Sequence, residues 1–439
     1  MIDVDQSETQ ATASSSAFTR APSYSPEERA GFRDFAKVMR DAMGEKGSFD
    51  ELSPEDAAEH GCLGTMHSLH RPGRVTFNED LCKAAASGGQ CKVLKWLREN
   101  GCPWNADACT SAAYNGHLGV LKWLRTNGCP WDADTCSYAA EGRHLDMLQW
   151  LRAKSCPWDE LTYNRAAYGG HLKVLQWAHA KGGFPWVELT CAWASLGGHL
   201  EMLQWLPANG CPWNEWTCVY AAKGGHLEVL QWAHANGCPW GADTCSSAAK
   251  GGHLEVLQWA RANGCSWDET TCSGAAEGGH LEVLQWARAN GCPWGVVTCY
   301  VAAEGGHLEV LQWACANGCP WNAVTCSAAA GSGYLEVLQW ARANGCPWDE
   351  RTCTNAAYGG QLEVLKWLRD NGCPWDTDAC AEAVQKEHLE VLRWLRANGC
   401  PWDAGTIALA RKYGHDDVVI WAKANGAPDE PAESDDDSD

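Results

Sequence analysis

Residues 278–294 read GGHLEVLQWARANGCPW, and this phrase recurs with small changes along most of the chain. Successive copies lie 27 residues apart, with one extra residue before the fourth copy. A fixed period of this length is typical of stacked repeats, in which each unit buries its apolar face against its neighbours. The Trp that closes each copy is Trp104, Trp131, Trp158, Trp186, Trp213, Trp240, Trp267, Trp294, Trp321, Trp348, Trp375 or Trp402.

One repeat, Gly241 to Trp267, predicts two short helices. The segment from Cys245 to Lys250 is rich in Ala, and Gly251-Gly252 ends it by permitting positive φ. We expect the second helix to begin at His253, whose side chain would hydrogen-bond the preceding turn, and to stop at Asn263-Gly264. Its apolar positions cover most of its circumference, as in a helix held on both sides.

Each repeat holds two Trp residues eight positions apart, such as Trp232 and Trp240. A Trp side chain buries about 150–250 Å² when it is packed. We therefore expect both Trp residues to belong to the core and to stack along the array as two ladders.

The flanking segments differ from the repeats. We expect residues 1–24 to be disordered because they are polar. Residues 25–51 predict an amphipathic helix and linker, since Ser25-Pro26 is a helix start and several apolar side chains share one face. The helix would either cover the open end of the array or dock into a partner. Residues 52–427 form the predicted array of about 14 units, and 428–439 form an acidic disordered tail.

The charge of the chain is −21, and residues 429–439 contribute seven of its acidic groups and no basic one. The remainder stays acidic, which argues against binding to nucleic acid and favours basic partners. The first 20 residues lack a signal sequence, and no run of residues is apolar enough to span a membrane. With 25 Cys residues, we expect reduced thiols in a cytoplasmic protein, with the nucleus as the alternative compartment.

The repeat resembles the ankyrin repeat. The phrase Ala-Ala-x-x-Gly-His-Leu-Glu-Val-Leu is similar to that family's helix–turn–helix centre, and Asn-Gly-Cys-Pro-Trp-Asp is similar to its Ala-Gly-Ala-Asp-Val-Asn. The unit is shorter than the usual 33 or so residues of the family, as in the Trp-rich ankyrin proteins of brown algae, related protists and large DNA viruses. The resemblance implies an all-α helix-turn-helix solenoid with its hairpin fingers shortened or absent, and a protein-binding concave face made of first helices.

Comparison among the repeats locates a candidate binding surface on that face. The positions one, two and five residues after the first-helix Cys vary while the surrounding phrase stays fixed, which makes them candidates for exposure. Aromatic residues at these positions cluster in five successive repeats, and Tyr and Trp with Arg dominate many binding surfaces. The candidate partner-binding residues are Tyr114, Tyr138, Arg165, Tyr168, Trp193 and Tyr220. The alternative is that these aromatic side chains fill gaps between the helices.

The Cys residues pair along the sequence at a spacing of seven, as in Cys238 and Cys245, with a His eight residues later. Zinc ligands are usually two to four residues apart, and Cys is also a small buried hydrophobe. We therefore expect structural thiols, with a metal or redox ladder and disulfides as the alternatives. No nucleophile elbow, phosphate-binding loop or HExxH motif is present.

These observations predict a monomeric, non-enzymatic protein-interaction scaffold or adaptor that needs no cofactor and contacts neither membrane nor nucleic acid. Two alternatives remain. One is a thiol-rich protein that binds metal or buffers redox state. The other is a substrate-recognition adaptor that recruits an enzyme through its N-terminal helix.

Overall fold

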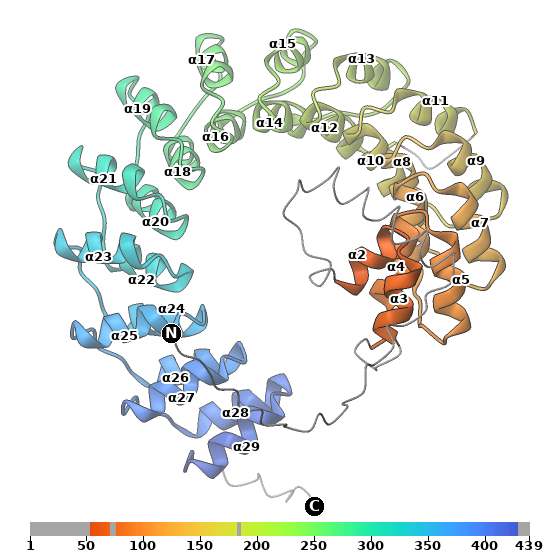
Figure 1. Cartoon of the computed structure of the whole chain (residues 1–439). Helices are drawn as coiled ribbons and strands as arrows, with labels where there is room; N and C mark the ends of the chain where they lie inside the picture. The colour runs from red at the N-terminus through yellow and green to blue at the C-terminus, as the bar shows by residue number, and fades with distance from the viewer. Residues whose placement is uncertain (1–52, 71–75, 182–185, 429–439) are drawn as a thin grey trace, which may run out of the picture. The chain divides into compact units, whose positions relative to one another are not determined.

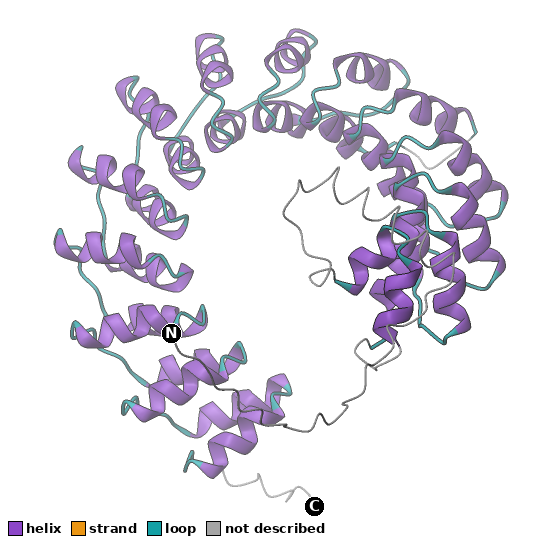
Figure 2. Cartoon of the chain, in the orientation of Figure 1, coloured by secondary structure: helices purple, strands orange, loops and turns teal. Residues whose placement is uncertain are grey.

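The computed structural model describes residues 53–70, 76–181 and 186–428. The segments predicted as a disordered N-terminus and an amphipathic helix lie outside these residues, as does the acidic tail from residue 429. The described residues form 28 helices, α2 to α29, joined by short loops, and no strand is found among them (Figure 2). The prediction of an all-α array of about 14 helix pairs is confirmed.

The chain divides into two compact units, residues 1–158 and 159–439. The first unit holds α2 to α9 and the second holds α10 to α29. Whether both belong to one continuous domain stays a prediction.

Each pair has a first helix with an even number and a second helix with an odd number. The first unit contains α2 (Pro54–Glu59), α3 (Leu63–His70), α4 (Glu79–Ser87), α5 (Cys91–Glu99), α6 (Ala106–Tyr114), α7 (Leu118–Thr126), α8 (Ala133–Glu141) and α9 (Leu145–Ala153).

The second unit contains α10 (Glu160–Tyr168), α11 (Leu172–Ala180), α12 (Glu188–Leu196), α13 (Leu200–Ala208), α14 (Glu215–Lys223), α15 (Leu227–Ala235), α16 (Ala242–Lys250), α17 (Leu254–Ala262), α18 (Glu269–Glu277), α19 (Leu281–Ala289), α20 (Val296–Glu304), α21 (Leu308–Ala316), α22 (Ala323–Ser332), α23 (Leu335–Ala343), α24 (Glu350–Tyr358), α25 (Leu362–Asp370), α26 (Thr377–Gln385), α27 (Leu389–Ala397), α28 (Ala404–Tyr413) and α29 (Asp416–Ala424).

Small residues hold the helices of the second unit together. Each first helix packs on the next first helix, as α16 does on α18 and α22 on α24. Cys245, Ala248 and Ala249 of α16 are completely buried there. The second helix buries a narrower stripe, which in α17 is Val256, Leu257 and Ala260. In Figure 1 the row of α10 to α29 curves, with the even-numbered helices along its inner side.

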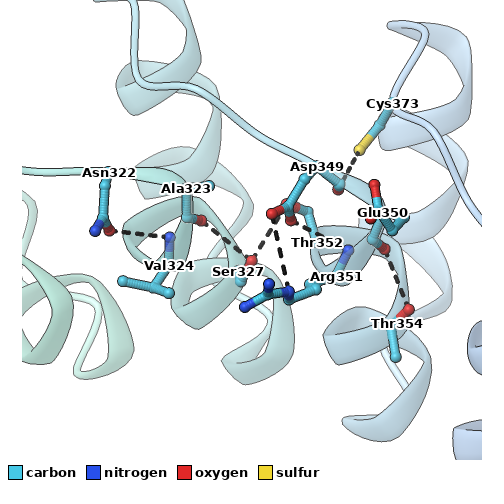
Figure 3. A network of polar contacts seen from close by, with 10 residues as sticks. All are labelled: Asn322, Ala323, Val324, Ser327, Asp349, Glu350, Arg351, Thr352, Thr354 and Cys373. Atoms are coloured by element: carbon cyan, nitrogen blue, oxygen red, sulfur yellow. Dashed lines mark hydrogen bonds and ion pairs between the residues drawn. The ribbon is translucent and has the colours of Figure 1, made fainter.

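The loop between repeats caps the helix that follows it. The side chains of Asn322 and Asp349 accept hydrogen bonds from the backbone N–H groups of Val324 and Arg351, two residues further on (Figure 3). These bonds satisfy donors that the first turn of a helix leaves unpaired. The Cys373 thiol then donates to the Asp349 carbonyl O at 3.5 Å, so the end of each repeat is tied to its beginning.

The repeated His joins neighbouring repeats. The Nε2–H group of His253 donates to the backbone O of Lys223, which ends the first helix of the preceding repeat (3.0 Å). Equivalent bonds join His226 to Leu196, His280 to Lys250 and His307 to Glu277. The prediction that His bonds the turn before it was therefore wrong about the partner, because stacking brings a carbonyl group thirty residues away into reach.

The Trp residues pair across each junction and do not form two separate ladders. The ring of Trp267, in the turn, lies 5.8 Å from that of Trp286, in the second helix of the next repeat, at an interplanar angle of 66°. The Arg261 guanidinium lies 4.1 Å from the centroid of the Trp267 ring. Both Trp residues are half-buried. The prediction of two continuous ladders was wrong, because each turn Trp packs on the helix Trp of the next repeat.

Two glycines of one repeat allow a matched test of what sets the distance between repeats. Gly252 and Gly264 both have left-handed φ angles, of 76° and 85°. A Cβ atom on Gly252 would lie 2.6 Å from the His280 ring, whereas one on Gly264 would meet no atom within 4 Å.

We predict that Gly264→Ala lowers the free energy of unfolding by about 1 kcal/mol, the cost of a left-handed backbone. Gly252→Ala should lower it by about 2 kcal/mol more, because the His280 ring must move. Urea denaturation followed by circular dichroism measures both values. Equal losses for the two variants would contradict a repeat spacing that depends on contact between Gly and His.

Candidate functional site

The exposed side of the first helices carries the positions that vary among repeats. In α16, the side chains near Cys245 that are exposed or half-buried are Asp243, Ser246, Ser247 and Lys250. The last three lie one, two and five residues after Cys245, where the comparison of repeats predicts exposure. Asp243, two residues before the Cys, also lies on this side. We call this side the first-helix face.

The first of the predicted positions is not uniformly exposed. One residue after the Cys, or after the Tyr163 that replaces it, the side chain is buried in five repeats. These residues are Ser137, Asn164, Ala192, Val219 and Ser327. Buried Asn164 accepts a hydrogen bond from Thr190 of the next first helix (3.0 Å). Variation among repeats therefore marks both exposed positions and positions that adjust packing.

In the first unit, Tyr114 of α6 and Tyr138 of α8 lie together. Their ring centroids are 6.0 Å apart and their planes meet at 82°, an edge-to-face arrangement. Tyr114 is 46 % exposed, and Tyr138 is half-buried. Both rings line a surface pocket of about 360 Å³, to which Lys83, Asp107 and Asp134 add charged groups. The pocket offers an aromatic wall beside both signs of charge.

In the second unit, three of the predicted aromatic residues form a row across α10, α12 and α14. The Trp193 ring lies 5.8 Å from the Tyr168 ring on one side and 5.8 Å from the Tyr220 ring on the other. Tyr168 is 47 % exposed, and the other two are half-buried. Arg165, also half-buried, lies on α10 three residues before Tyr168. Whether these rings bind a partner or fill gaps between the helices stays a prediction.

The structure adds three apolar residues that the comparison of repeats missed. Leu161, Leu189 and Trp216 lie two residues before the Cys position of α10, α12 and α14, and each is more than 40 % exposed. The Trp216 ring lies 6.0 Å from the Tyr220 ring. The sequence contained a signal that this position is exposed, because neighbouring repeats have the charged residues Asp134 and Asp243 there. We call these three residues together with Tyr168, Trp193 and Tyr220 the α10–α14 aromatic patch.

Further along the second unit the same face is mixed, because α16 and α18 carry charged residues there whereas α20 and α22 expose Val297 and Val324. Lys250 of α16 and Glu277 of α18 form an exposed ion pair at 2.6 Å. Glu304 of α20 follows at the equivalent position and is also exposed. Exposed apolar surface that is gathered in one place and bordered by polar groups is characteristic of interaction sites. The α10–α14 aromatic patch has this character.

Most thiols of the array lie in pairs. Cys residues twenty positions apart, at the two ends of one repeat, face each other, and the Sγ atoms of Cys191 and Cys211 are 3.5 Å apart. Cys residues seven positions apart belong to the end of one repeat and the start of the next, so the spacing seen along the sequence does not correspond to the thiols that face each other. The other facing pairs are 82/102, 109/129, 136/156, 218/238, 245/265, 272/292, 299/319, 326/346, 353/373 and 380/400.

These thiols are part of the core. All 25 are free, and only Cys91 and Cys315 are not buried. The hydrogen bond from Cys245 to Cys265, together with burial, raises the pKa of the Cys245 thiol. No group of three or more His, Cys, Asp or Glu side chains within the described ranges is arranged to hold a metal ion.

The solved structures that are similar to this chain are those of helical repeat proteins. The ankyrin repeat domain of human ASB11 is similar over 36 % of this chain and 84 % of its own, with 18 % identity and a TM-score of 0.30. The pentatricopeptide repeat protein PPR10 in complex with an 18-nt psaJ RNA element is similar over 90 % of this chain and 66 % of its own, with 15 % identity and a TM-score of 0.32. PPR10 from maize has 14 % identity, a TM-score of 0.30 and coverage of 92 % and 78 %.

No protein-family model and no curated protein matches the chain. The chain resembles the ankyrin repeat in its recurring phrase and in its array of helix pairs. Within the described ranges, no helix is both long and apolar enough to cross a membrane.

The burial of the thiols leads to a prediction about their reactivity. In the folded, reduced protein a disulfide reagent such as Ellman's should react quickly with only two thiols, Cys91 and Cys315, because the other 23 lie inside the array. In urea all 25 should react at similar rates. The release of the reagent's chromophore over time measures the reaction rates in the folded protein and in urea. Fast reaction of many thiols in the native protein would show that the array opens readily.

Proposed function

We propose that this chain is a non-enzymatic protein-interaction scaffold that binds its partner through the first-helix face. The observation that carries the proposal is the α10–α14 aromatic patch, where six large side chains of three successive repeats reach the surface together. Arg165 lies on the same helix as Tyr168 and adds a charged group. Tyr114 and Tyr138 supply a smaller aromatic site in the first unit.

Physical chemistry favours binding at such a patch. Tyr and Trp side chains give large contact areas for little loss of conformational entropy, and with Arg they supply most of the energy in many interfaces. Edge-to-face contacts fix the rings in advance, as between Tyr168 and Trp193. A partner then meets a surface that is already ordered, which lowers the cost of association.

The charge of the chain narrows the class of partner. At −21 the chain repels polyanions at long range and attracts basic surfaces. We therefore propose a protein partner with a basic border around an apolar contact region, bound by a monomer of this chain in the cytoplasm or the nucleus. No nucleic acid and no membrane takes part in this proposal.

We predict that replacing the patch abolishes partner binding. The triple variant Tyr168→Ala/Trp193→Ala/Tyr220→Ala should lose a partner that the intact chain retains in a pull-down. Each replaced ring in an interface centre costs about 1–3 kcal/mol, so the affinity should fall by far more than tenfold. Titration calorimetry with the identified partner measures the loss.

A matched control comes from the chain itself. Tyr358 occupies in α24 the position that Tyr168 occupies in α10, and it is 44 % exposed, yet it lies outside the patch. Tyr358→Ala should retain the partner fully. A second variant, Tyr114→Ala/Tyr138→Ala, tests the site in the first unit separately. Equal retention by all variants, with circular dichroism unchanged, would remove the aromatic residues from the binding site.

A further inference from the structure

One repeat carries a third thiol in place of an arginine. The position six residues before the turn Trp is Arg in eight repeats, and each guanidinium covers that Trp ring. In the α20–α21 repeat the position is Cys315, six residues before Trp321. In this repeat no Arg guanidinium lies over the Trp321 ring, and the Cys315 side chain places a sulfur atom at the surface of α21.

Cys315 lies against the buried thiol pair of the same repeat. Its Sγ atom is 4.0 Å from the Sγ atom of Cys299 on α20. Cys299 is completely buried and also bonds Cys319, in the turn that closes the repeat. Hydrogen bonds to Cys315 and Cys319, and then burial, raise the pKa of the Cys299 thiol. Three sulfur atoms therefore form a chain that runs from the half-buried Cys315 inward.

No other repeat of the described ranges combines these features. The remaining Cys pairs have both thiols buried, and an oxidant reaches them only when the array opens. Cys91 is half-buried like Cys315, but no second Cys lies within hydrogen-bonding distance of it in the described part. The α20–α21 repeat alone places an accessible thiol in contact with a second thiol that can trap its oxidised form.

We propose that Cys315, Cys299 and Cys319 form a peroxide-reactive thiol site, in which Cys315 meets the oxidant and Cys299 closes a disulfide with it. This goes beyond the proposed binding function and does not depend on it. The ligand class is a small hydroperoxide, with hydrogen peroxide as the simplest member.

The chemistry has two balanced steps. The Cys315 sulfur attacks one oxygen of hydrogen peroxide and breaks the O–O bond, which gives a sulfenic acid and one water molecule. The Cys299 sulfur then attacks the Cys315 sulfur, and the hydroxyl group leaves with the Cys299 proton as a second water molecule. Two thiols are oxidised to one disulfide, and one peroxide is reduced to two waters. Cys319 can exchange with this disulfide, because it contacts Cys299.

Closing the disulfide requires a local movement. The two sulfur atoms must approach from 4.0 Å to the bonding distance of about 2 Å. Rotation about the Cα–Cβ bond of the half-buried Cys315 moves its sulfur atom without disturbing the buried helix face. The bond would link α20 to α21, the two helices of one repeat, and leave the first-helix face free.

The test uses the full-length reduced protein, to which hydrogen peroxide is added in small increments. Remaining thiols are blocked with N-ethylmaleimide under denaturing conditions, and disulfide-linked peptides are identified by mass spectrometry. We expect a disulfide between Cys315 and Cys299, or Cys319 after exchange, to form more than about tenfold faster than any other, because the remaining pairs need opening of the array. Dithiothreitol should reverse it.

Three controls separate the site from general thiol oxidation. Cys315→Arg restores the residue found in most repeats and should abolish the early disulfide while keeping the fold, as judged by circular dichroism. Cys91→Ser removes the other accessible thiol and should leave the early disulfide unchanged. Addition of peroxide in urea should remove the preference for this repeat. An early disulfide that persists in Cys315→Arg, or oxidation of Cys315 that never yields a disulfide, would overturn the proposal.

Discussion

The contact between a His ring and two glycines of the array sets the distance at which one repeat stacks on the next. The His280 imidazole lies only 2.6 Å from where a Cβ atom on Gly252 would be, and 2.5 Å from where one on Gly278 would be. Its Nε2–H group donates to the carbonyl O of Lys250. Any larger residue at Gly252 would push the ring away and break that bond. Because the contact recurs at most junctions, small changes in the distance between repeats would add up along the row. This explains why the phrase Gly-Gly-His is repeated with little change.

The short repeat has a second consequence, which concerns cysteine. With no room for a projecting hairpin, the turn runs directly from the end of one second helix into the cap of the next first helix. The turn thiol, such as Cys373, bonds the cap carbonyl at the start of its own repeat and faces the first-helix Cys353. A small, weakly polar side chain suits this position, since a larger residue would separate the helices. This geometry explains the 22 thiols of the eleven facing pairs, and Cys62, Cys91 and Cys315 lie outside it.

Because Ala and Cys make the contacts between first helices, the opposite side of each helix is free to vary. The chain uses that freedom unevenly. Large aromatic and aliphatic residues gather on it at α10, α12 and α14. Further along, Lys250, Glu277 and Glu304 alternate with smaller exposed residues such as Val297 and Val324. A framework that is repeated almost unchanged can thus carry a local surface with its own chemistry, as repeat proteins generally do.

The sequence by itself determined the helix pairs, their period, the glycine stops and the aromatic character of the candidate surface, because these depend on local patterns within one repeat. Only the tertiary structure decided which residues of different repeats meet. Stacking paired Cys211 with Cys191 and not with Cys218, which is seven residues away, and it paired turn Trp residues with helix Trp residues of the next repeat. It also buried Asn164 and exposed Leu161 on the same helix. These outcomes depend on the rotation and spacing between repeats, and no pattern within a single repeat encodes that relation.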